Sequence, residues 1–148
     1  GRFYHTAKNW HATDVVRICA DCPFISGCEI DHLVVFFKSN NYDFAYNNVP
    51  IDNCYPDGIG AEIVSFSMLE RLHKEAMDPF DREHVSSYIR SRPEIFNIGT
   101  FDPEDERLHH PNIRIDLDTS QDYQQLLRMN VDINMEAHQI VKAARELI

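Results

Sequence analysis

The chain has 148 residues, which suits one domain over residues 1–148, and 43% of them are hydrophobic, enough for a packed core. Its 24 acidic residues outnumber its 14 lysines and arginines, and the formal charge of −10 argues against a general nucleic-acid binder, which normally shows a basic face. No apolar run is long enough to span a bilayer, and the polar and aromatic first ten residues do not resemble a signal peptide. We therefore expect no membrane partner and a cytoplasmic location.

Helical and extended patterns alternate along the chain. The first expected helix, residues 2–10, has only Gly1 before it, which suggests that an upstream part is missing. Further helices are expected at residues 29–38, 68–77, 82–90, 120–129 and 135–147. Strands are expected at residues 14–19, 42–46, 61–66, 95–101 and 113–117. This order predicts an α/β layered domain with a mixed sheet.

Polar residues mark the expected helix starts. Ser26 or Gly27 starts the second helix, Ser67 caps the third, and Thr119 caps the helix after the last strand. The spacing Ser-x-x-Glu from Ser67 is that of a capping box. Residues 47–60, with two prolines and two glycines, predict an irregular loop of the length that is often functional.

Two predicted strands share an Arg-x-x-x-Asp spacing. Arg17 precedes Asp21 in the first, and Arg114 precedes Asp118 in the strand of residues 113–117. Residues i and i+4 of an extended strand share a face, and ligands of open α/β sheets bind outside the carboxyl ends of the strands. Two carboxylates there predict a divalent-metal or acid/base site. Oxygen ligands without a His or Cys partner favour Mg²⁺.

Each of these residues also has a plain structural interpretation. Asp21 can cap a turn, and Asp118 can start a helix. Asp116, on the same face as Asp118, is either a second ligand or a partner for Arg114. An isolated buried charge is costly, so for Arg17 and Arg114 a salt bridge is at least as compatible with the pattern as phosphate binding.

Other chemically active side chains lie outside this pair. Glu62, after the two glycines of the loop, is suited to a sugar hydroxyl or is a solvated strand end. Arg82 and His84, at a helix start, suit an anionic ligand, with a surface ion pair as the alternative for Arg82. Cys19 and Cys22 have zinc or redox spacing, but no second Cys or His pair completes a tetrahedral site, so we expect reduced thiols.

Four segments in order resemble one family. Residues 17–23, R-I-C-A-D-C-P, resemble its R-hydrophobic-x-x-D-C-P motif, and residues 55–62 resemble its Y-P-x-G-x-x-x-E segment. Residues 78–89 are similar to its D-P-x-x-R-E-H-V-x-x-Y-I segment, and residues 117–122 resemble V-D-T-P-E-D. The family is the cytidylyltransferases of surface polysaccharide synthesis, of the spore coat type, related to the acylneuraminate and KDO cytidylyltransferases.

The resemblance implies a nucleotide-diphospho-sugar transferase fold, a Rossmann-like α/β/α sandwich. It also implies transfer of CMP from CTP to a sugar or sugar acid with Mg²⁺ and release of pyrophosphate. Asp21 and Asp118 would then be catalytic and hold the metal and the α-phosphate. Glu62, Arg82 and His84 would line the acceptor side.

The resemblance further implies that the chain is the C-terminal part of such an enzyme. Nothing in it fits the N-terminal strand and the loop of small and basic residues that cradle the nucleotide. The alternative is a non-catalytic remnant that serves sugar binding or assembly. A sheet without its first strands exposes an edge or an apolar face, so we expect a homodimer.

Overall fold

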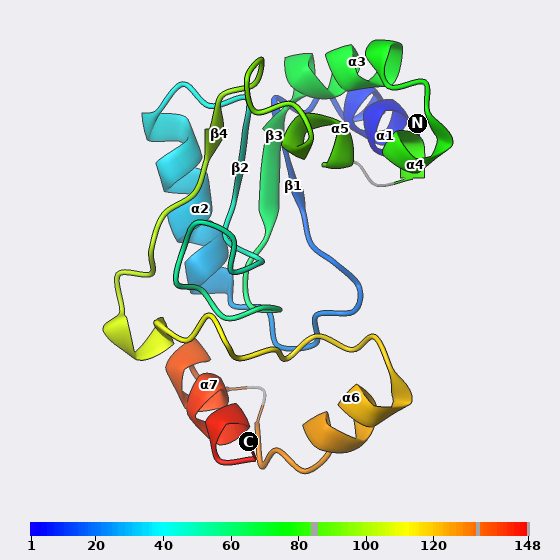
Figure 1. The fold of residues 1–148 in the computed structure, drawn as a ribbon. Helices are drawn as coiled ribbons and strands as arrows, with labels where there is room; N and C mark the ends of the chain where they lie inside the picture. Colours follow the sequence, from blue (N-terminus) through cyan, green and yellow to red (C-terminus); the bar gives the residue numbers. More distant parts are fainter. Residues whose placement is uncertain (84–85, 133, 148) are drawn as a thin grey trace.

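Four short strands form one mixed sheet within residues 1–83, 86–132 and 134–147, the parts of the chain that the computed structural model describes (Figure 1). The strands are β1 (Asp14–Arg17), β2 (Phe44–Tyr46), β3 (Glu62–Ser65) and β4 (Ile98–Gly99). Their order is β1-β3-β2-β4, in which β3 pairs antiparallel with β1 and β2, and β2 pairs parallel with β4. The predicted mixed sheet is confirmed.

Helices cover both faces of this sheet. They are α1 (Arg2–Asn9), α2 (Gly27–Ser39), α3 (Phe66–Glu75), α4 (Pro79–Glu83) and α5 (Ser87–Arg90). One core joins α1, α3 and α5 to Phe44, Tyr46 and Val64. A second core joins α2 to Ala45 and Ile63 on the opposite face. Neighbouring residues of a strand point to opposite faces, so the alternation produces the predicted three layers.

A third core lies outside the sheet. It contains the 3-10 helix η1 (Glu106–Leu108) and the helix α7 (Ala137–Arg145), with α6 (Ser120–Leu126) at its margin. Ile113 and Ile115 pack there against Ile59 of the long loop and Val141 of α7. Figure 1 shows the segment of residues 113–117 crossing between the sheet and these two C-terminal helices. None of the helices in the described parts is both long and apolar enough to cross a membrane.

The predicted strand at residues 113–117 is wrong. Ile113 and Ile115 are buried with the alternation of a strand, but the segment forms only an isolated bridge, between Arg114 and Asp57. Its backbone partners belong to a loop and a turn instead of a strand, so no ladder extends from the bridge. The prediction of a buried strand at residues 14–19 is also wrong, because β1 is a half-exposed edge strand that ends at Arg17.

Two helix boundaries also differ from the prediction. Ser65, not Ser67, caps α3, because its side chain accepts from the Met68 N–H at 3.2 Å while Ser67 already lies inside the helix. The single helix expected over residues 82–90 is instead described as α4 and α5. The caps at Ser26 and Thr119 are confirmed, the latter as a capping box.

Candidate active site

The turn after β1 and the segment of residues 113–117 are joined through their backbones. The Leu117 N–H donates to the Asp21 carbonyl at 2.7 Å. On its other side the segment bonds to the long loop, because the Ile115 N–H donates to the Asp57 carbonyl at 3.1 Å and the Asp57 N–H donates to the Ile113 carbonyl at 2.9 Å. The two Arg-x-x-x-Asp segments therefore do meet, although neither acid lies on a strand.

Gly58 permits the close approach of the loop to this segment. Its φ is +98°, in the left-handed region that side chains rarely adopt. A Cβ atom at this position would lie 2.9 Å from the backbone nitrogen of Asp116. The close backbone contact of Gly58 is with residues 115–116 of the same chain.

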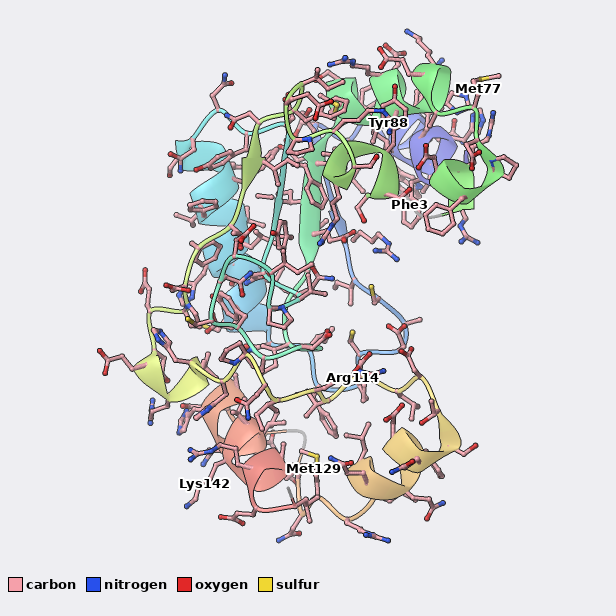
Figure 2. The ribbon with its side chains drawn as sticks, in the orientation of Figure 1. Phe3, Met77, Tyr88, Arg114, Met129 and Lys142 are labelled. Carbon is pink, nitrogen blue, oxygen red and sulfur yellow. The ribbon has the colours of Figure 1, made fainter. Side chains whose placement is uncertain are left out.

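Four aspartates gather around this crossing, and we call them the acidic cluster: Asp21, Asp57, Asp116 and Asp118. Arg114 lies among them, on the segment that Figure 2 shows passing between the sheet and α6. Its Nη2 atom donates to Asp118 Oδ2 at 2.6 Å and to Asp116 Oδ2 at 3.0 Å. Arg114 therefore forms ion pairs within the chain, which was one of the two roles predicted for it from the sequence.

The pKa of Asp57 responds to burial and to the other acids of the acidic cluster. Burial raises the pKa of its carboxyl to about 6, and the charges of Asp116, Asp118 and Asp21 act in the same direction. Arg114 opposes this shift and does not cancel it. Burial and the neighbouring acids therefore both disfavour the charged form of Asp57, and a cation bound there would favour it.

Asp21 is exposed and shares its turn with two thiols. The ligand atoms of Cys19, Asp21 and Cys22 all lie within 4.8 Å of one another. A hydrogen bond from Cys22 lowers the pKa of the Cys19 thiol to about 7, and the same interaction raises the pKa of Cys22. The thiols are free, as predicted.

An open groove of about 530 Å³ runs beside this turn. Arg17, Asp21 and Leu117 line it together with the first residues of α1. It brings a basic side chain and an acidic one to the same surface. The arrangement suits an anionic ligand that also carries a metal ion.

Glu62 holds Arg17 at the edge of the groove. Its carboxylate is buried and accepts from Arg17 Nη1 at 2.8 Å, from Arg90 Nη2 at 3.0 Å and from Ser86 Oγ at 3.0 Å. The Arg90 guanidinium also lies 4.2 Å from the centre of the Tyr46 ring. Glu62 is therefore not a solvated strand end. Its contact with a sugar hydroxyl stays a prediction.

The other predicted site residues lie elsewhere. Arg82 is exposed on α4 and lines a small cavity between α1 and α3 with His73. Figure 1 shows α4 beside those helices, away from the crossing segment. His84 lies outside the described residues. Asp57 was missed as a site residue, because the acids that surround it come from other segments of the chain.

No protein-family model matches the chain. An uncharacterized protein of Methanocaldococcus jannaschii is 31% identical over 144 residues, which make up 95% of this chain and 56% of that protein. The spore coat polysaccharide biosynthesis protein SpsF of Bacillus subtilis is 27% identical over 127 residues, 84% of this chain and 50% of SpsF. The chain thus spans about half the length of the curated relatives it matches.

The fold has a counterpart among solved structures. A cytidylyltransferase from Leptospira borgpetersenii serovar Hardjo-bovis matches with a TM-score of 0.83 and 25% identity, over 98% of this chain and 61% of that one. The predicted α/β fold and the resemblance to cytidylyltransferases are confirmed.

Proposed function

From its resemblance to cytidylyltransferases, we propose that this chain is the metal-binding and acceptor-binding part of an enzyme that transfers CMP from CTP to a sugar or sugar acid, for surface polysaccharide synthesis. The observation that carries the proposal is the acidic cluster, where the turn after β1 meets residues 113–117. The relatives are about twice as long, and we propose that residues of the whole protein complete the nucleotide site.

Asp21 and Asp118 are the proposed Mg²⁺ ligands. Both are exposed carboxylates, and both add to the negative charge that raises the pKa of the half-buried Asp57 carboxyl, after burial itself. Hard oxygen ligands suit Mg²⁺ with retained waters and substrate phosphate. When bound, Mg²⁺ would neutralise charge developing on the transferred phosphoryl group.

The proposal gives different roles to Arg17, which is held in place, and Arg114, which must release one of its partners. Glu62 orients Arg17 toward the groove that Asp21 also lines, so Arg17 is a preorganised phosphate contact. Arg114 is paired with Asp118, so this ion pair must break when Asp118 binds a metal. Asp116, whose Oδ2 accepts from Arg114 Nη2 at 3.0 Å, would remain its partner, because Asp122 Oδ2 already accepts from Thr119 in the capping box.

The acceptor assignments are the finer part of the proposal. Arg82 and His84 bind the acceptor sugar only if α4 approaches the groove in the whole protein. The edge strand β1 offers unpaired backbone groups, which is our basis for proposing a homodimer. The cytoplasmic location stays a prediction.

One observation favours a second candidate, a non-catalytic sugar-binding or assembly module. Arg17 and Arg114 are both already paired with acids inside the chain. A remnant would keep such pairs for structure alone, and would bind neither Mg²⁺ nor CTP.

Calorimetry with Mg²⁺, with and without CTP, tests the proposal. We expect Asp21→Asn and Asp118→Asn each to weaken Mg²⁺ binding about tenfold or more, since even indirect partners of a metal typically contribute that much. Asp31→Asn, which removes an exposed charge from α2, is the matched control and should change nothing. Equal Mg²⁺ affinity in all three variants would exclude the metal site and leave the module as the better candidate.

A further inference from the structure

A second group of ligand-type side chains lies on the first turns of α2, away from the acidic cluster. The ligand atoms of Cys28, Glu29 and His32 all lie within 4.8 Å of one another. Cys28 and His32 are four residues apart on one helix, so their side chains share a face. Cys28 Sγ lies 3.8 Å from His32 Nε2.

This separation fits a shared metal ion. Zinc binds Cys sulfur at about 2.3 Å and His nitrogen at about 2.0 Å, so two such ligands of a tetrahedral ion lie roughly 3.6 Å apart. The observed pair requires almost no rearrangement. A borderline-soft ion such as Zn²⁺ is the expected occupant, because a thiolate and an imidazole suit it better than they suit Mg²⁺.

Glu29 positions the imidazole of His32. Its carboxylate is buried, and Oε2 lies 3.3 Å from His32 Nδ1. The Tyr55 hydroxyl donates to the same oxygen at 2.6 Å, which fixes the carboxylate from the loop side. A carboxylate that accepts a hydrogen bond from Nδ1–H keeps the proton on Nδ1 and leaves Nε2 with a free lone pair, here directed toward Cys28. Metal-binding histidines are commonly held by such a carboxylate.

The surroundings are open and acidic. A groove of about 670 Å³ separates the start of α2 from η1 and the start of α7. Glu104 and Glu136 line its opposite wall, and His138 Nδ1 lies 3.2 Å from Glu136 Oε2. Burial and then the charges of Glu29, Asp31, Glu136 and Glu104 raise the pKa of the Cys28 thiol. The same negative charge attracts a cation, and a bound cation stabilises the thiolate.

We propose that Cys28 and His32 bind a zinc-class divalent ion, with Glu29 as the positioning residue and Glu104 or Glu136 as a further ligand from the opposite wall. The ion would tie α2 to the third core. This site is separate from the acidic cluster and does not depend on the proposed nucleotidyl transfer.

Cobalt(II) and zinc(II) titrations of the purified, reduced chain test the site. Co²⁺ should produce a thiolate-to-metal charge-transfer band that Cys28→Ser abolishes. Cys54→Ser removes a thiol that is held near Asp102 instead and should retain the band. His32→Ala should weaken Zn²⁺ binding, measured against a chromophoric chelator, by about tenfold or more.

Two further variants make the result decisive. Cys22→Ser should also retain the band, which separates this site from the thiols beside Asp21. Glu29→Gln keeps the side-chain volume but replaces the charged acceptor beside His32 Nδ1 with a neutral amide, which weakens that hydrogen bond, so Zn²⁺ affinity should fall about tenfold while the band stays. Absence of any band, or a band that survives Cys28→Ser, overturns the proposal.

Discussion

Two carboxylate sites lie a few residues apart on the chain and are built in opposite ways. Glu62 is buried, and two arginines and a serine satisfy it. Asp57, in the acidic cluster, is half-buried beside three other acids, of which Asp116 and Asp118 pair with Arg114. Glu62 is therefore neutralised by two arginines of the same chain, whereas Asp57 lies among acids that a bound cation would neutralise.

The difference separates a carboxylate with complete internal partners from one that lies among other acids. A buried charge with complete partners stabilises the fold only while every partner remains. A cluster with too little positive charge reduces stability in the absence of a ligand and gains from binding one. Variants at the two sites should therefore shift stability in opposite directions.

Removal of Glu62 should have the largest effect. Glu62→Ala leaves Arg17 and Arg90 without their common partner in a largely buried place, which typically costs about 3–5 kcal/mol. Urea unfolding measures this change. Glu70→Ala removes a partly exposed acid that pairs with Lys74 and accepts from the Tyr4 hydroxyl, and it should cost far less. Equal losses in the two variants would contradict the structural role of Glu62.

Substitution of Gly58 should have an intermediate effect. Gly58→Ala forces a side chain into the left-handed region and against the Asp116 backbone, which should cost about 2 kcal/mol. Gly27→Ala is the matched control, because a Cβ atom there meets nothing within 4 Å and its φ is not positive. Urea unfolding of both variants is the measurement, and similar midpoints would contradict the close crossing.

Neutralisation of Asp57 should have the smallest effect and the opposite sign. A carboxyl whose pKa is raised to about 6 on folding holds its proton more tightly in the folded state. Its unfavourable contribution is therefore full above pH 6 and disappears as the pH falls toward about 4, the ordinary pKa of an aspartate. Asp57→Asn should gain about 1 kcal/mol at pH 7, a figure reduced for partial solvent exposure.

Unfolding at pH 7 and pH 4 checks this sign. The gain from Asp57→Asn should vanish at pH 4, and saturating Mg²⁺ should reduce it at pH 7 if the cluster binds the metal. A gain that is the same at both pH values would show that Asp57 does not titrate as described.

Local patterns predicted most of the fold. Apolar periodicity located the helices, and Ser26 and Thr119 began theirs because a cap depends on neighbours in the sequence. Residues 113–117 have a strand pattern that is equally satisfied by burying Ile113 and Ile115 in the third core. Alternation reports which side chains are buried, not whether a partner strand lies alongside.

The site was harder to predict than the fold. The sequence predicts Asp21 and Asp118 as a pair of ligands, and the bond from the Leu117 N–H to the Asp21 carbonyl joins their two segments. Their shared metal site stays a prediction. The partner of Arg17 could not be predicted from the sequence, because Glu62 lies beside Arg17 only through the register of β1 on β3. Asp57 was overlooked because its neighbours come from two other segments.

The bond between Leu117 and Asp21 has a consequence for folding kinetics. It joins residues about a hundred positions apart, and closing so long a loop must precede any gain from the contact. The helices and the β2–β3 pairing can form first, with the crossing added late. The acidic cluster would then be assembled only in chains that have already completed the sheet.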